Sequence, residues 1–411
     1  MKPQASRADI MPVILGGDMS AYPMAREFHE AYGVRTTCVI PDPIRIIRTS
    51  SFIDTCAIAE QSDELIVDAV CRLARENPGK RLLVMANQDA SVARLERIRD
   101  AFPANVISPL PPHDAMVRAS NKIEFARMCA SYGLDAPRSE VVHLAGADPI
   151  PPTSIDFPLI AKPAESSAEY VALYWKGFKK IYFVQSQIEL DQLWRDLRAE
   201  GFSRDFLVQE LIGGDDTYVD MLTAYVDQNG KPTMFASAQV LLEDHDPKLF
   251  GNPVAMITRP MPELWEKVGR MLVDLGWRGF ANFDMKRDPK TGRVLFMDFN
   301  PRLGCNSYYA CAGGINPMRA LVNDHVDGIG EVQRLSRKAL YSRAPASLVR
   351  RYVADDALLA EFDQIVRDGL VFDPMRYRAD SLSSRLMGWA MEKNYIRKFA
   401  RHYPERTDTA F

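Results

Sequence analysis

The chain has 411 residues, of which 47% are hydrophobic and 26% are charged, and its formal net charge at pH 7 is −3. This balance predicts a globular protein with hydrophobic cores, and the length suggests about two to four domains. A net charge so close to zero does not indicate nucleic acid as a partner. Residues 331–411 hold 15 Lys and Arg against 11 Asp and Glu, whereas the rest of the chain holds 36 against 43. The basic end indicates either an anionic substrate there or an ordinary solvated helical surface.

The cysteines are scattered without the paired spacing of a metal site. They are Cys38, Cys56, Cys71, Cys129, Cys305 and Cys311. In a chain of this length they predict reduced thiols and a cytoplasmic protein. The first residues hold no apolar run long enough for the core of a signal peptide, and no stretch approaches the ~18 apolar residues of a membrane span. We therefore expect neither a targeting segment nor a membrane span.

The first part of the chain alternates short apolar strands with helices. Strands are predicted at 12–16, 36–40 and 81–86, and helices at 22–32 and 62–76. Gly16 and Gly17 form a turn after the first strand, Ser20 is expected to cap the helix that follows, and Gly33 to end it. Strands that alternate with helices indicate a parallel sheet covered on both faces. Residues 1–115 are therefore predicted to form a Rossmann-like domain.

The middle of the chain mixes helices with antiparallel hairpins. Strands are predicted at 157–162, 180–185, 206–211, 217–226 and 233–242, and helices at 121–132, 187–199 and 263–275. Asn121 and Glu124 have the spacing of a capping box, and Asn229 with Gly230 is a hairpin signal. The predicted division is an α+β unit at 116–205, a second at 206–330 and a mostly helical, basic extension at 331–411.

A predicted hairpin at 280–302 carries a dense set of polar side chains. With the turn at 288–292, six of them share one face, because side chains alternate along a strand. They are Asn282, Asp284, Lys286, Asp298, Asn300 and Arg302. Mg²⁺ takes hard oxygen ligands, usually one or two carboxylates with substrate phosphates, and a nearby arginine suits a phosphate or an oxyanion. The hairpin therefore predicts either a magnesium site or an ordinary solvated sheet face.

Three charged residues stand at the ends of apolar or helical segments. Lys162 and Glu210 each end an apolar strand, and Lys122 lies in the first turn of a helix. A lysine at a buried strand end needs an anionic partner, because an unpaired buried charge is costly. Each of these residues also fits an ordinary surface position, and Asp215 and Asp216 are by themselves typical of a turn.

In this order, the motifs resemble those of the ATP-grasp superfamily of ligases. These motifs cover about residues 115–310. In chain order they are the region around Lys122, PLIAKP, LVQELIGGDD, FDMK and FMDFNPR. The resemblance implies an α/β and α+β protein with the ATP-grasp fold, in which a Rossmann-like preATP-grasp domain precedes two α+β subdomains that clasp ATP. It also implies a ligase that uses ATP and Mg²⁺, with Mn²⁺ as an alternative metal.

The same resemblance implies roles for individual residues. The residues expected to bind ATP are Lys122, Lys162, Ser166, Ser167, Glu210, Leu211, Ile212, Asp215 and Asp216. The expected metal ligands are Asp284, Asp298 and Asn300. Arg302 would stabilise the acyl phosphate or the tetrahedral intermediate, and Lys162 would neutralise the transferred phosphate. The chain departs from the superfamily at Asp298, where glutamate is usual, and in its phosphate loop, which has no glycine before Gly177.

Further segments resemble the carboxylate–amine ligases of the D-aspartate ligase type. They are GGDMSAYPMAREFHEAYGV, KPAESS followed by KKIYFV, NPRLGCNSYY with AGGIN, and the basic helical end. This resemblance implies that an amino acid is activated as an acyl phosphate and joined to an amine of a peptidoglycan precursor. The residues expected to hold the acid are Gly16, Gly17, Arg302, Asn306 and Ser307. A ligase that makes free dipeptides and a non-catalytic ATP sensor are the alternatives.

Overall fold

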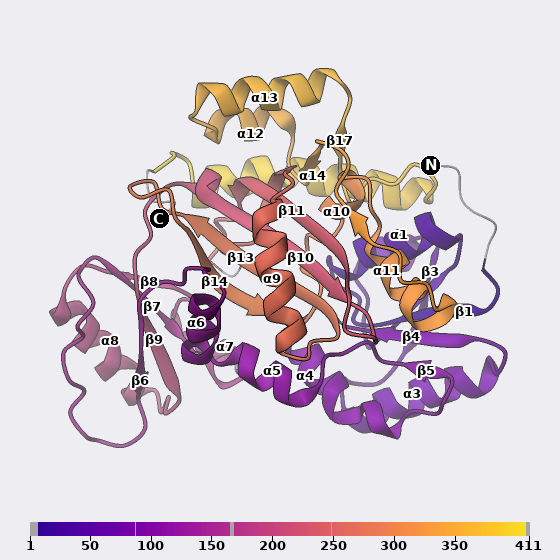
Figure 1. The fold of residues 1–411 in the computed structure, drawn as a ribbon, viewed down its shortest axis with the longest axis horizontal. Helices are drawn as coiled ribbons and strands as arrows, with labels where there is room; N and C mark the ends of the chain where they lie inside the picture. The colour runs from indigo at the N-terminus through magenta and orange to yellow at the C-terminus, as the bar shows by residue number, and fades with distance from the viewer. Residues whose placement is uncertain (1–6, 87, 165–167, 248, 408–411) are drawn as a thin grey trace.

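The computed structural model describes residues 7–86, 88–164, 168–247 and 249–407, which form three β-sheets with helices packed around them (Figure 1). A parallel sheet comes first in the chain, a large mixed sheet occupies the centre of Figure 1, and a small antiparallel sheet forms a lobe at its left. The predicted combination of a parallel sheet followed by antiparallel hairpins is confirmed.

The first sheet is parallel throughout, with strand order β3-β2-β1-β4-β5. Its strands are β1 (Ile10–Leu15), β2 (Thr36–Ile40), β3 (Ile53–Ala57), β4 (Arg81–Met85) and β5 (Val106–Ile107). The helices around it are α1 (Ala21–Tyr32), α2 (Arg45–Thr49), α3 (Asp63–Glu76) and α4 (Asp89–Ile98). Ile14 of β1 is buried with α1, whereas its neighbour Val13 is buried with α3 and α4. Helices therefore cover both faces of the sheet, as expected.

The helix α1 ends as predicted but begins differently. Gly33 closes it in the left-handed conformation, at φ 65°, with its N–H bonded to the carbonyl of His29. At the other end the Ser20 side chain caps nothing and donates to Asp18 at 2.6 Å. The Asp18 carboxylate also accepts from the backbone N–H groups of Ser20 and Ala21. The prediction that Ser20 caps the helix is wrong, because a carboxylate, the stronger acceptor, occupies the free amides.

Two consecutive helices, α5 (His113–Ser120) and α6 (Lys122–Ser131), lead from the parallel sheet to the next one. Only half of the predicted capping box forms at their junction. The Asn121 side chain accepts from the N–H groups of Ile123 and Glu124, but the Glu124 carboxylate bonds to Arg118 at 2.6 Å. The reason is that the Asn121 N–H is already bonded to the carbonyl of Val117 in the preceding helix.

The second sheet is antiparallel, with strand order β6-β9-β7-β8. Its strands are β6 (Ser139–His143), β7 (Leu159–Pro163), β8 (Tyr182–Val184) and β9 (Asp205–Glu210), and its helices are α7 (Ala168–Leu173) and α8 (Gln187–Ala199). Leu190 and Trp194 of α8 are buried against Phe206 of β9. β9 begins next to the predicted boundary between the two α+β units, at 205/206, and it pairs with β7 in this sheet.

The third sheet has strand order β14-β13-β10-β11-β12-β16-β17, with β15 beside β11. Its strands are β10 (Val219–Val226), β11 (Pro232–Glu243), β12 (Pro253–Thr258), β13 (Gly279–Arg287), β14 (Val294–Asn300), β15 (Gln333–Arg334), β16 (Leu340–Ser342) and β17 (Val371–Phe372). The helix α9 (Pro262–Asp274) crosses the front of this sheet in Figure 1. Two short helices, α10 (Tyr309–Ala312) and α11 (Pro317–Val322), connect β14 to β15.

The end of the chain contains the predicted helices, α12 (Ala346–Tyr352), α13 (Asp356–Arg367) and α14 (Leu382–His402). It also contains β16 and β17, which continue the third sheet beyond β12. Tyr395 and Phe399 of α14 are buried in one cluster with residues of β11 and β12. Residues 331–407 therefore contribute to the central core as well as to a helical surface. Within the described ranges, none of the helices combines the length and apolar character needed to cross a membrane.

Candidate active site

The predicted hairpin forms and pairs its polar residues largely as expected. Asn282 lies opposite Asn300, and Asp284 lies opposite Asp298. The Asn300 amide donates to Asp284 at 3.2 Å. A β-bulge follows this pair, so Lys286 lies opposite Leu295 and does not extend the polar row across both strands. The shared face is confirmed for Asn282, Asp284, Asp298 and Asn300. Lys286 also stays on that face of β13, which pairs regularly with β10, but the extra residue on β14 leaves no polar residue opposite it.

Arg302 does not lie on the strand face that was predicted for it. It stands two residues beyond the end of β14, and its Nε donates to the Asp89 carboxylate at 2.6 Å. Its Nη2 lies 3.5 Å from the Asn300 amide oxygen. The prediction of a shared face is therefore corrected, while Arg302 remains beside the hairpin. Asp89 was missed by the sequence analysis, although it begins the helix after β4, at the sheet edge where ligands usually bind.

Two lysines from different elements meet one carboxylate of the hairpin. Lys122, from α6, pairs with Oδ1 of Asp298. Lys162, from β7, lies with its Nζ 3.4 Å from Oδ2 of the same residue. Helix α6 and the second and third sheets are thus joined at one point, and both predicted lysines have the anionic partner that their burial requires.

Both lysines have lowered pKa values, mainly because they are buried. Burial lowers the pKa of Lys122 to about 8, opposed by the carboxylates of Asp284 and Asp89. Burial lowers the pKa of Lys162 to about 7, and the charges of Lys122 and Lys180 lower it further. Because the lysines crowd each other in a poorly solvated place, a bound polyanion such as a triphosphate would stabilise their charged forms.

The predicted metal ligands can be tested by their chemistry and surroundings. Burial raises the pKa of Asp284, so its negative charge is incompletely compensated. Asp298 opposite and the Asn300 amide oxygen add two hard oxygen donors beside it. Within the described part of the chain, no group of three or more His, Cys, Asp and Glu residues is arranged to hold a metal by itself. Magnesium ordinarily uses few protein carboxylates together with phosphate oxygens, so this donor set fits a metal that arrives with a nucleotide.

Gly16 and Gly17 follow β1 at the carboxyl end of the parallel sheet. Gly16 has a φ of 146°, which side chains rarely adopt, and a Cβ on Gly17 would lie 3.0 Å from the side chain of Ile40. The next residue, Asp18, accepts a hydrogen bond from the side chain of Gln88, just before α4. Since β1 and β4 are adjacent and parallel, these glycines lie on the same sheet edge as the start of α4.

The residues predicted to bind the adenine end of ATP lie at the end of β9 and in the segment after it. The Glu210 carboxylate accepts from the backbone N–H of Arg138 at 2.9 Å. Leu211 and Ile212 follow the strand directly, and Ile212 is buried. Their contact with a nucleotide stays a prediction. Ser166 and Ser167 lie outside the described residues.

Asp215 and Asp216 have internal partners. Asp215 accepts from the hydroxyl of Thr217 at 2.6 Å. The buried Asp216 accepts from the backbone N–H of Glu243 at 2.8 Å and hydrogen-bonds His245 at 3.0 Å. Burial and the Asp216 charge raise the pKa of Glu243 to about 8, opposed by the charge of Lys286. The sequence analysis did not predict that Asp216 and Glu243 lie close together. A contact of Asp215 or Asp216 with the ribose stays a prediction.

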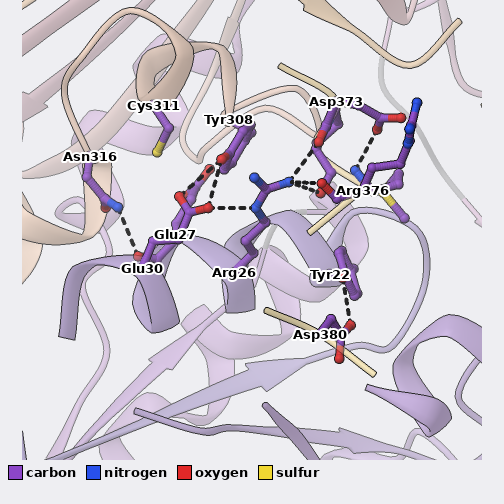
Figure 2. Close-up of polar contacts among 12 residues, drawn as sticks. Tyr22, Arg26, Glu27, Glu30, Tyr308, Cys311, Asn316, Asp373, Arg376 and Asp380 are labelled. Atoms are coloured by element: carbon purple, nitrogen blue, oxygen red, sulfur yellow. Dashed lines mark hydrogen bonds and ion pairs between the residues drawn. The ribbon is translucent and has the colours of Figure 1, made fainter. Parts of the chain in front are cut away.

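Asn306 and Ser307 are held by the interior of the protein. The Asn306 amide is buried and lies 3.5 Å from the sulfur of Met256. Ser307 donates to the Glu27 carboxylate of α1 at 2.7 Å. Figure 2 shows the surrounding polar network, in which the Tyr308 hydroxyl donates to the Glu30 carboxylate of α1. These contacts tie the segment after β14 to the first helix, and a substrate contact of Asn306 or Ser307 stays a prediction.

Three sheets arranged around paired lysines and carboxylates define the ATP-grasp fold, which comparison with solved structures confirms. L-amino acid ligase from Bacillus licheniformis superposes with a TM-score of 0.52 at 16% identity over 82% of this chain and 80% of that one. N5-carboxyaminoimidazole synthetase from Staphylococcus aureus, solved with ADP, superposes with a TM-score of 0.56 at 12% identity over 82% and 83% of the two chains.

The sequence itself resembles one ligase along nearly its whole length. It is 27% identical to D-aspartate ligase from Enterococcus faecium (strain Aus0004), and the match covers 96% of this chain and 97% of that protein. No family model matches the chain. The resemblance expected from the motifs is thus confirmed over the whole chain rather than over the ATP-grasp region alone.

Proposed function

We propose that the protein is an ATP-dependent ligase that joins a carboxylate to an amine and releases ADP and phosphate. The observation that carries the proposal is the convergence of Lys122 and Lys162 on Asp298, beside Asp284 and Arg302. This group provides cations for a triphosphate, oxygen ligands for a metal and a guanidinium for an oxyanion. A protein that only senses ATP needs the first two features but not the third.

The chemistry follows from the positions of these groups. Lys162 and Lys122 neutralise the terminal phosphates of ATP while the γ-phosphoryl group passes to a carboxylate oxygen of the acid, which leaves ADP and an acyl phosphate. The amine nitrogen then bonds to the acyl carbon, the carbon–oxygen bond to phosphate breaks, and the amine loses a proton. Arg302 stabilises the oxyanion between these events. Asp284, Asp298 and Asn300 would hold Mg²⁺, which supplies further positive charge at the phosphates; Mn²⁺ accepts the same oxygen ligands.

The substrates we propose are a D-aspartate-like amino acid and an amine of a peptidoglycan precursor. The support is the whole-length resemblance to D-aspartate ligase and the mildly basic end of the chain, which would attract an anionic precursor. We place the protein in the cytoplasm, where ATP is available and where its six free cysteines would stay reduced. A ligase that uses free amino acids as acceptors is the second candidate, favoured by the similarity to an L-amino acid ligase.

The test is an ADP-release screen of the full chain with D- and L-amino acids, with and without a lysine-containing peptidoglycan precursor. Mass measurement of the ligated product identifies the acceptor. We expect ADP release only when an acid and an amine are both present, and a product that contains the precursor. Exclusive formation of free dipeptides supports the second candidate. ATP binding without turnover for every combination refutes the ligase and leaves a sensor.

A further inference from the structure

Among the described residues, one cation near the candidate site, Arg343, forms no ion pair. Arg343 follows β16, and within the described residues its buried Nε has no hydrogen-bond partner. Its Nη2 reaches only a weak acceptor, the sulfur of Met19, at 3.7 Å, and its guanidinium carbon lies 5.6 Å from the ring centre of Tyr395. The neighbouring carboxylate of Asp244 is already bonded to Lys398 at 2.6 Å. Arg343 is thus held in place by packing, and its hydrogen-bonding capacity is left largely unused.

Tyr341 adds a second unused polar group on the same face of β16, because side chains two residues apart share a face. Tyr341 is fully buried, and its hydroxyl has no partner among the described residues. Burial raises the pKa of this hydroxyl and the Arg343 charge lowers it, so the hydroxyl lies within electrostatic range of the guanidinium. Buried polar groups are nearly always hydrogen-bonded. Two unpartnered donors, two residues apart along the chain, therefore point to a ligand oxygen that completes them.

The place they occupy adjoins the candidate active site. Burial raises the pKa of the Cys305 thiol, and the positive charges of Arg343 and Arg302 both lower it. Both guanidinium groups therefore lie within electrostatic range of Cys305. On the other side, Met19, which Arg343 contacts, comes two residues after Gly17. The two guanidinium groups therefore flank the segment and the loop to which the sequence analysis assigns the amino-acid substrate.

We infer that Arg343, assisted by Tyr341, binds a second carboxylate of the substrate acid, the one that is not activated beside Arg302, so that the site selects a dicarboxylic amino acid. Arginine binds a carboxylate through two parallel hydrogen bonds. A site built around such a contact rejects analogues that lack the group, because its own buried polar atoms would stay unpaired. The inference rests on the proposed function, from which it takes the nature of the substrate.

The experiment compares acids that differ in one carboxylate. Calorimetry measures the binding of aspartate and asparagine, and of glutamate and glutamine, in both enantiomers, to the full chain. ADP release is measured with the same acids in the presence of ATP, Mg²⁺ and the lysine-containing peptidoglycan precursor. We expect the wild-type protein to prefer one dicarboxylic acid over its amide by about 10- to 100-fold, the effect of a charge-assisted contact. Arg343→Gln should abolish most of this preference without weakening the amide. Arg343→Lys should keep part of it.

Two further variants separate recognition from folding. Tyr341→Phe removes only the hydroxyl and should reduce the preference in the same direction. Arg350→Gln, at an exposed arginine of α12 paired with Asp363, is the matched control and should change nothing. If Arg343→Gln does not fold, Arg343→Lys and Tyr341→Phe decide the question.

Three outcomes are distinguishable. Equal weakening of the acid and its amide by Arg343→Gln, or no preference in the wild-type protein, overturns the inference and leaves Arg343 a packing role against Tyr395. A preference that depends on Arg343, found without ADP release, refutes the ligase and supports the carboxylate site. ADP release that depends on an added acid, with the same selectivity in Arg343→Gln, supports the ligase and overturns the site.

Discussion

The buried carboxylate of Glu27 gives the stability of this protein a pH dependence that can be measured. Glu27 lies on α1 with none of its surface exposed. One oxygen accepts from Ser307, and the other has no partner among the described residues. The nearest guanidinium, that of Arg26, is used by Glu30 and by backbone carbonyls of the segment before α14 (Figure 2). Burial therefore raises the pKa of Glu27 to about 8, assisted by the charge of Glu30 and opposed by the Ser307 hydrogen bond.

The sign of the effect follows from the two pKa values. Below pH 4.5, the ordinary value for glutamic acid, the folded and unfolded chains both hold the proton, and Glu27 contributes nothing to the pH dependence. Between pH 4.5 and about 8 the folded chain keeps a proton that the unfolded chain has released, so the free energy of unfolding falls as the pH rises. Each unit of pKa shift is worth about 1.4 kcal/mol, which sets an upper limit of ~5 kcal/mol for the loss.

Glu27→Gln replaces the titrating group by a neutral amide that can still accept from Ser307. We expect the variant to exceed the wild-type protein by about 2–4 kcal/mol in free energy of unfolding at pH 8, and by about 1 kcal/mol or less at pH 5, after allowance for the amide atoms left unpaired. The assay is urea denaturation of both proteins at pH 5, 6, 7 and 8. Glu30→Gln, at a half-buried carboxylate paired with Arg26, is the control and should destabilise. Parallel pH profiles for Glu27→Gln and the wild-type protein would refute the reasoning.

The remaining predictions concern the active site and the end of the chain. Asp298→Asn should lower magnesium-dependent ADP formation about 100-fold or more while the chain still folds, although the loss of the charge that pairs with Lys122 and Lys162 should lower the thermal midpoint; near-normal turnover would show that the metal assignment is wrong. Lys162→Ala should weaken ATP binding or slow single-turnover phosphoryl transfer by about 2 kcal/mol, whereas Lys176→Ala, at an exposed lysine paired with Glu200, should do neither. Removal of residues 375–411 takes Tyr395 and Phe399 out of a buried cluster and should lower the denaturation midpoint or prevent folding; an unchanged midpoint would contradict this.

The hairpin at 280–302 shows how far local patterns carry a prediction. Alternation with period two predicts that Asp284 and Asp298 meet, because any regular hairpin with its turn near 290 brings them together. The burial cost of a charged strand end predicts that Lys162 has an anionic partner, and Asp298 is that partner. The bulge on β14 that places Leu295 opposite Lys286 has no signature in the sequence, since it arises from the fit of the two strands to their neighbours.

Arg343 and Glu27 could not have been found in this way. Arg343 follows a strand of only three residues, inside a segment that is mostly helical, and that strand exists because it pairs with β12 far earlier in the chain. Glu27 lies on α1 beside the charged residues Arg26 and Glu30 and becomes fully buried because the segment around Ser307 packs over it. In both cases a distant part of the chain determines the environment, and no local periodicity reports it.

The ion pairs at Asp298 also bear on the order in which ligands can occupy the site. In the structure, the cations that would serve the phosphates are paired with the carboxylate that would serve the metal. If the groups act as proposed, a metal on Asp298 frees Lys122 and Lys162 for phosphate, and phosphate on the lysines frees Asp298 for the metal. Each ligand thereby removes a cost of binding the other, so the two affinities are coupled reciprocally. The lysine–carboxylate pairs thus favour the joint binding of nucleotide and metal over either alone.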